Sequence, residues 1–188
     1  MKRHPSLDDL FDPAIRIVAY DPAWPAQAEA ELRRIEEAVG EAAVRLEHVG
    51  STAVPGLAAK PILDLQVSVP SIDRWESYGR PMESLGYLFA SDPDSPDYHL
   101  FAKPPERPRT HHVHVCEAGS EHERRHLAVR DFLRAHPDEA ARYAELKREA
   151  VEQHGLDRLA YIEAKAAYVD ALQARAIAWS EDREGGSG

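Results

Sequence analysis

The chain has 188 residues, of which 43% are hydrophobic and 30% charged, and its formal net charge is −10. This length fits one domain with a real core, and the acidic balance argues against non-specific nucleic-acid binding. No apolar run approaches the length of a membrane span and the N-terminus lacks the apolar stretch of a signal peptide, so we expect no membrane partner. The single cysteine, Cys116, excludes an intramolecular disulfide and fits a cytoplasmic location.

The chain divides into three parts by composition. Residues 1–14 are polar and interrupted by proline, which predicts a flexible N-terminal arm. Residues 15–180 are expected to form a single domain, with a sheet core over 15–118 and helices over 119–180. Residues 181–188 end in Gly-Gly-Ser-Gly and are expected to be a disordered tail.

Helical and alternating patterns follow one another through the domain. Asp21-Pro22 indicates a helix start, with Asp21 as the N-cap, and Gly40 ends that helix. After Gly119, the pattern Ser120-Glu121-His122-Glu123 is typical of a capping box. The sequence predicts strands over 44–49, 62–69, 87–90, 98–103 and 110–116, and further helices over about 71–85, 120–135, 137–155 and 157–179.

Two of these strands flank a turn that suits an anion. The turn contains Gly50, Ser51 and Thr52, whose backbone N–H groups and hydroxyls are predicted to bind phosphate, although an ordinary tight turn would use the same residues. In the following strand, alternation puts Asp64 on a polar face with Gln66 and Ser68, opposite a face of leucines and valines. A carboxylate next to an anion-binding turn indicates metal-assisted phosphate chemistry.

These motifs resemble the signature of the GrpB family, also called UPF0157. The resemblance rests on His48-Val49-Gly50-Ser51-Thr52-Ala53-Val54-Pro55-Gly56-Leu57, on Lys60-Pro61-Ile62-Leu63-Asp64, on His112-Val113-His114-Val115 and on Val129-Arg130-Asp131-Phe132-Leu133-Arg134. It extends over roughly residues 15–178. It implies an α+β, nucleotidyltransferase-like fold: a mixed β-sheet with flanking helices and a C-terminal helical layer. A related domain is fused behind dephospho-CoA kinase in some bacteria.

The resemblance also shows where this chain departs from the wider nucleotidyltransferase pattern. That superfamily uses a Gly-Ser turn followed by two acids, two residues apart on the next strand. Here Gly50, Ser51 and Asp64 match, but the second acidic position is Gln66, which cannot neutralise a second cation. We expect His112 and His114, which share one strand face, to complete a metal site with Asp64 for Mn²⁺, Mg²⁺ or Zn²⁺. Polar strand positions without metal, or direct phosphate contact, are the alternatives.

Three other features offer weaker signals. Lys60 and Arg109 are candidates for phosphate binding, with Lys103 and Arg107 as possible helpers, and each also fits a solvated loop. The run from His122 to His126 matches the HExxH zinc-protease pattern, but it falls at a polar helix start with two arginines inside it, so we interpret it as incidental. The alternation from His112 to Cys116 is similar to that of histidine-triad hydrolases, but its third histidine is a cysteine.

The leading hypothesis is a metal-dependent nucleotidyltransferase that moves a nucleoside monophosphate from a nucleoside triphosphate to an acceptor. Asp64 and His48 would be catalytic, with His48 as a base. A second hypothesis, favoured by Gln66, is a non-catalytic module that binds a nucleotide or a CoA precursor or assists folding. A third is a metal-dependent phosphoester hydrolase that uses water. The expected partner is a nucleoside triphosphate or another phosphate-bearing small molecule.

Overall fold

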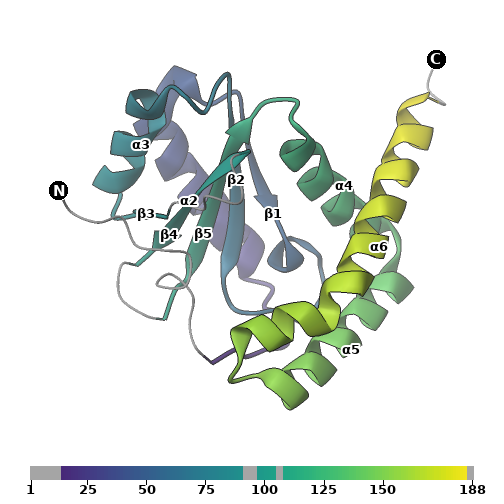
Figure 1. Cartoon of the computed structure of the whole chain (residues 1–188). Helices are drawn as coiled ribbons and strands as arrows, with labels where there is room; N and C mark the ends of the chain where they lie inside the picture. The colour runs from purple at the N-terminus through teal and green to yellow at the C-terminus, as the bar shows by residue number, and fades with distance from the viewer. Residues whose placement is uncertain (1–13, 91–96, 105–107, 186–188) are drawn as a thin grey trace.

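The computed structural model describes residues 14–90, 97–104 and 108–185. Its centre is a five-stranded sheet with the order β1-β2-β5-β4-β3 (Figure 1). The strands are β1 (Arg45–Val49), β2 (Leu63–Val69), β3 (Leu88–Ala90), β4 (Tyr98–Lys103) and β5 (His111–Glu117). Strand β2 runs parallel to β5 and every other pair is antiparallel, so the sheet is mixed.

Helices cover both faces of this sheet. Helices α2 (Trp24–Val39) and α3 (Trp75–Ser84) pack on one face, and α4 (Glu121–Ala135) lies on the other (Figure 1). Helices α5 (Pro137–His154) and α6 (Arg158–Gly185) pack on each other beside α4 and form the C-terminal layer. The short turns η1 (Gly40–Ala42) and η2 (Ser51–Ala53) flank β1. The α+β class and the mixed sheet expected from the sequence are confirmed.

Alternation along β2 separates an apolar face from a polar one. Leu63, Leu65, Val67 and Val69 are all buried in the core that α2 and α3 share with the sheet. Burying each such side chain contributes about 1.5–3 kcal/mol. The opposite face carries Asp64, Gln66 and Ser68, which must find hydrogen-bond partners because burial removes water.

Helix α4 supplies those partners. Ser68 Oγ donates to Glu123 Oε1 at 2.5 Å, and Gln66 Oε1 lies 3.0 Å from His126 Nδ1. Arg130, also on α4, donates from Nη1 to Oε2 of Glu47 on the neighbouring strand β1 at 2.6 Å. The polar residues of α4 therefore position the helix against β1 and β2, while Asp64, at the start of β2, lies beyond these contacts.

Several predicted boundaries shift. Helix α2 begins at Trp24 with Ala23 at the N-cap position, because Asp21 Oδ1 accepts from the N–H of Ala23 in a turn before the helix. Half of the predicted capping box forms, since Ser120 Oγ accepts from the N–H of Glu123, whereas the Glu123 carboxylate accepts from the N–H of Gly119 and not from that of Ser120. Residues 181–185, predicted as part of a disordered tail, continue α6 as helix. The rest of that tail and residues 1–13 of the arm lie outside the described residues.

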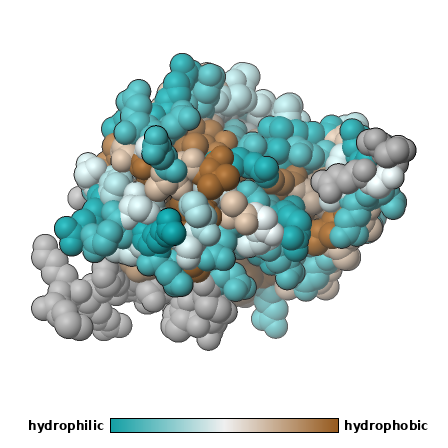
Figure 2. Space-filling view, turned by 90° about the horizontal axis from the view of Figure 1, so that it is seen from above, coloured by the Kyte–Doolittle hydropathy of each residue, from teal (hydrophilic) through white to brown (hydrophobic). Residues whose placement is uncertain are grey.

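The surface seen from above is mostly hydrophilic, with a hydrophobic patch near its middle (Figure 2). Within the part of the chain that the structure describes, no helix has the length and hydrophobicity needed to cross a membrane. The large hydrophobic side chains that remain exposed include Leu156, Leu159 and Ile162, around the start of α6.

We predict that Glu123→Ala lowers the free energy of unfolding by about 2–4 kcal/mol, because it leaves Ser68 and the Gly119 N–H without their buried acceptor. Glu121→Ala is the matched control, since Glu121 is an exposed acid in the same first helical turn and should cost no more than about 0.5 kcal/mol. Urea denaturation of both variants measures the difference. Equal costs would contradict a role for Glu123 in joining α4 to the sheet.

Candidate functional site

The turn after β1 and the aspartate of β2 are in direct contact. Gly50 has φ +69°, and a Cβ added there would meet Asp64 Oδ2 at 2.6 Å and Asp64 Cβ at 2.9 Å. Only glycine combines this backbone conformation with such a close approach. The Gly50–Ser51 turn and the Asp64 carboxylate, which the sequence places fourteen residues apart, therefore form one site.

A cavity of about 250 Å³ opens beside this contact, between η2, the start of β2, α5 and α6. Ser51, Thr52 and Asp64 line it on one side. Four basic side chains line it as well, against the one carboxylate of Asp64: Lys60, Lys147, Arg158 and Lys165. In an acidic chain, this local excess of positive charge favours an anionic ligand.

The lysines of the cavity are held in place by short contacts. Lys147 Nζ donates to Ser51 Oγ at 3.0 Å and to the carbonyl of Ala58 at 2.6 Å, and its ammonium lies 4.5 Å from the centre of the Tyr143 ring. The ammoniums of Lys60 and Lys165 lie 5.6 and 5.4 Å from the centre of the Tyr161 ring. The aromatic faces attract these cations and fix them around the cavity.

Burial and neighbouring positive charges lower the pKa values of two of these lysines. Burial, followed by the nearby ammonium of Lys165, lowers the pKa of Lys147 to about 7. Burial and the ammonium of Lys60 likewise lower the pKa of Lys165. A bound anion would stabilise the charged form of both groups, so the cavity is electrostatically suited to receive negative charge.

Asp64 stays ionised in this setting. Burial raises its pKa, but the hydrogen bond with His112 and the positive charges nearby outweigh burial, and the pKa lies below its usual value. His112 Nδ1 is 3.5 Å from Asp64 Oδ1, across the parallel pairing of β2 with β5. Of the proposed metal ligands, the structure therefore brings Asp64 and His112 together.

Other sequence candidates lie elsewhere. His48 pairs with Leu65 on the face turned away from Asp64, bonds to Thr52 Oγ1 at 2.9 Å, and has a pKa that burial lowers to about 4. Arg109 is buried and donates to the carbonyl of Pro104, and Lys103 pairs with Glu31 at 2.6 Å. None of these three residues lines the cavity. Arg107 is outside the described residues.

The second acidic position of the nucleotidyltransferase pattern is not available to a metal. Gln66 is fully buried, and its Oε1 faces His126 Nδ1 on α4 instead of the cavity. A pair of metal ions shared by two carboxylates therefore does not fit this site. A single cation does fit, because Mg²⁺ is commonly held by one carboxylate together with ligand phosphates and water.

The structure also forms a histidine cluster that the sequence reasoning missed. His114 on β5 meets His122 and His126 on α4, and one nitrogen from each ring lies within 4.8 Å of the others. His114 thus belongs with these two residues more closely than with Asp64 and His112. The four-residue spacing of His122 and His126 was the available signal, because it puts both on one helix face.

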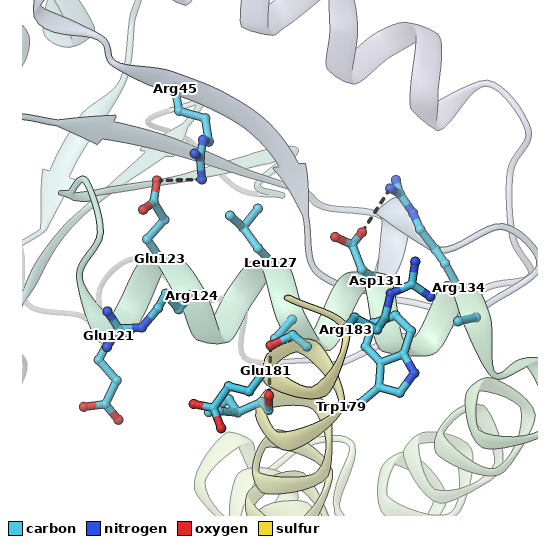
Figure 3. A pocket seen from close by; sticks show the side chains of 14 residues that line it. Arg45, Glu121, Glu123, Arg124, Leu127, Asp131, Arg134, Trp179, Glu181 and Arg183 are labelled. Atoms are coloured by element: carbon cyan, nitrogen blue, oxygen red, sulfur yellow. Dashed lines mark hydrogen bonds and ion pairs between the residues drawn. The ribbon is translucent and has the colours of Figure 1, made fainter. Parts of the chain in front are cut away.

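A second cavity, of about 860 Å³, lies between α4 and the end of α6 (Figure 3). It is lined by four arginines and four acids, namely Arg45, Arg124, Arg134, Arg183, Glu121, Glu123, Asp131 and Glu181. Ion pairs join Arg45 to Glu123 at 3.4 Å and Arg134 to Asp131 at 3.5 Å (Figure 3). Because its charges balance, this cavity lacks the positive excess found beside Asp64.

The mixed sheet, the glycine-serine turn and the aspartate on the next strand define a nucleotidyltransferase-like fold. The chain belongs to the GrpB family, since its residues 14–175 match the sequence model of the family described as GrpB protein. It is similar to the crystal structure of conserved protein GrpB from Enterococcus faecalis, with a TM-score of 0.80 and 33% identity over 88% of this chain and 99% of that one.

Curated relatives extend the comparison. A UPF0157 protein of Pseudomonas aeruginosa is 40% identical over 170 residues, which cover 89% of this chain and 69% of that protein. UPF0157 protein YqkA of Bacillus subtilis is 33% identical over 93% of this chain. The matched region spans only 50% of the length of YqkA. A protein of Mycolicibacterium paratuberculosis named dephospho-CoA kinase is 32% identical over 89% of this chain and 47% of its own length.

We predict that Gly50→Ala destabilises the fold by more than about 2 kcal/mol, because the methyl group adds a clash with Asp64 to the strain of a positive φ. Gly56→Ala is the control, since Gly56 has φ +80° but no atom within 4 Å of an added Cβ, and it should cost only about 1 kcal/mol. Thermal unfolding of both variants gives the comparison. If the two cost the same, the contact between Gly50 and Asp64 does not constrain the site.

Proposed function

We propose that the chain binds a nucleoside triphosphate, with its divalent cation, in the cavity beside Asp64 and transfers the nucleoside monophosphate to an acceptor hydroxyl. The observation that carries this proposal is the set of four basic side chains around the Gly50–Ser51 turn, facing a single ionised aspartate. Phosphate groups and their cation need both kinds of group side by side.

The basic residues would hold the phosphates. Lys147 and Lys165 come from two helices, and Lys60 comes from the segment that leads into β2, so the cavity would surround a phosphate group from several directions. Each charge-assisted hydrogen bond of this kind contributes about 1.5–3 kcal/mol. Ser51 Oγ, already bonded to Lys147, would add a neutral hydroxyl contact.

Asp64 would hold the divalent cation that arrives with the triphosphate. That cation would neutralise charge on the phosphates during in-line displacement. The residues of this chain then have to orient the ligand: Gly50 keeps Asp64 at the cavity wall, and His112 fixes the Asp64 carboxylate from β5. Both contacts hold the aspartate in one position before the ligand arrives.

The size of the cavity limits which part of the ligand it takes. At about 250 Å³ it is smaller than the 300–1,000 Å³ typical of whole drug-sized ligands. The phosphates would therefore lie inside and the nucleoside at the rim. Ile162 lines the cavity and is 38% exposed, and Leu159, one turn earlier in α6, is 67% exposed. This apolar rim suits the face of a nucleobase.

Binding without transfer is the second candidate, and Gln66 favours it. Gln66 fills the second acidic position and is bonded within the fold, so only Asp64 offers a charge to a cation. Relatives named dephospho-CoA kinase suggest a CoA precursor as the ligand of such a binding module. The cavity would hold its phosphates in the same manner.

We predict that calorimetry detects Mg²⁺-triphosphate binding and that Lys165→Gln weakens it at least tenfold, about 1.4 kcal/mol. Arg148→Gln is the control, because Arg148 is an exposed cation one position from Lys147 and does not line the cavity. It should change affinity less than twofold. Equal effects would show that the cavity is not the binding site.

Products of an α-labelled triphosphate, incubated with a pool of hydroxyl acceptors, then separate the candidates. Pyrophosphate together with a labelled acceptor supports transfer, and Asp64→Asn should abolish both. Inorganic phosphate or monophosphate without a labelled acceptor would instead indicate hydrolysis. Binding with no product supports the binding module, and no binding of phosphate ligands contradicts both proposals.

We also predict that triphosphate binding takes up a proton near pH 8, where the ligand itself is fully ionised. Lys147 has a pKa of about 7, so it is mostly neutral at that pH, and a bound anion raises the pKa again. Affinity should therefore fall as pH rises through this range. Calorimetry in two buffers of different ionisation enthalpy measures the uptake, which Lys147→Met should remove. Uptake unchanged in this variant would contradict the role of Lys147.

A further inference from the structure

The three clustered histidines lie apart from the proposed phosphate site, and nothing in the proposed reaction uses them. Strand β5 pairs in register with β2, so His114 lies opposite Gln66 on the polar face of the sheet. Helix α4 crosses this face and presents His122 and His126, four residues apart. Among the described residues, this is the one group of three or more possible metal ligands whose donor atoms come this close.

The hydrogen bond of His126 prepares its ring for a cation. Its Nδ1 lies 3.0 Å from Gln66 Oε1, an oxygen that can only accept, so Nδ1 carries the proton. The other nitrogen, Nε2, then has its lone pair available. Metal-binding histidines almost always show this arrangement, in which a neighbouring oxygen holds the far N–H and orients the ring.

The other two rings carry buried nitrogens with no hydrogen-bond partner among the described residues, namely His114 Nδ1 and His122 Nε2. His122 is 95% buried. A buried polar atom without a partner normally carries a cost, which a bound ligand would remove. Tyr98 stacks on the His122 ring with centroids 4.2 Å apart, and this fixes the ring in the cluster.

We propose that His114, His122 and His126 bind a divalent transition metal of the zinc class, with three imidazole ligands and an open fourth position. Neutral imidazole suits Zn²⁺, Co²⁺, Ni²⁺ and Cu²⁺, whereas Mg²⁺ and Ca²⁺ prefer oxygen. In a tetrahedral zinc site the ligand nitrogens are about 3.3 Å apart, so the cluster, now within 4.8 Å, closes by small side-chain shifts.

The site joins α4 to β5 and is not a protease centre. The HExxH pattern would use Glu123 as a general base beside the metal. Here the Glu123 carboxylate accepts from Ser68 Oγ and from the N–H of Gly119, on the face turned toward β1 and β2. The metal would instead connect the helix to the sheet at a second point, next to the contact between Gln66 and His126.

One neighbouring cation opposes the metal. Arg125 Nη2 lies 3.3 Å from His122 Nδ1, and the charge of Arg125 acts on all three histidines. Metal binding at His122 Nε2 would move the ring proton to Nδ1, and Arg125 would then have to turn away. Removing this charge should therefore tighten metal binding.

Titration of the full chain with Co²⁺, followed by visible absorption and then by displacement with Zn²⁺, tests the site. We expect one equivalent to give the intense bands of four-coordinate Co²⁺. His122→Phe, which keeps a ring to stack on Tyr98, should weaken binding at least about 100-fold, because it removes one of three ligands. Arg125→Gln should tighten it several-fold. His154→Gln, a histidine outside the cluster, should leave it unchanged.

X-ray absorption of the zinc-loaded wild-type chain gives a measure that needs no variant to fold, and it should show three imidazole ligands. Absence of binding, six-coordinate Co²⁺, or fewer than three imidazoles would overturn the proposal. The proposal would also be overturned if a folded His122→Phe variant bound Co²⁺ as tightly as the wild-type chain. Because triphosphate binding uses other residues, loss of metal binding in His122→Phe with triphosphate affinity retained would separate this site from the proposed function.

Discussion

The polar face of β2 determines how α4 packs on the sheet and which residue faces the cavity. A strand that carries Asp64, Gln66 and Ser68 on one face cannot be covered by an apolar helix, because each buried polar group needs a partner. Helix α4 covers it with Glu123 against Ser68 and His126 against Gln66. Because Gln66 and Ser68 are bonded to α4, Asp64 is the residue of this polar face that lines the cavity.

The same constraint explains why this fold differs from the two-acid pattern. A second acid in place of Gln66 would lie under α4 beside His126, where it would be buried away from the cavity. Glutamine satisfies this position as a neutral hydrogen-bond acceptor. Positive charge for phosphate binding comes instead from the C-terminal layer, where Lys147 and Lys165 reach the Gly50–Ser51 turn from α5 and α6.

Much of this arrangement follows from the sequence. Alternation in β2 predicts its two faces, and the capping pattern at Ser120 predicts the start of α4. The sequence places the Gly50 turn next to the strand that carries Asp64, but it does not give the close approach of the two residues. The contributions of Lys147, Lys165 and Arg158 could not be predicted, because they depend on how α5 and α6 fold back on the turn. The histidine cluster was missed for a related reason. Its members come from β5 and α4, and sequence periodicity does not predict how a helix packs on a strand.

A structure of the chain with a Mg²⁺-bound, non-hydrolysable triphosphate would show whether the cavity beside Asp64 binds phosphates. We expect the phosphates to contact Lys147 and Lys165 and the ion to lie on Asp64, with Gln66 still bonded to His126. Phosphates bound in the charge-balanced cavity between α4 and α6, or an ion placed without contact to Asp64, would contradict this expectation.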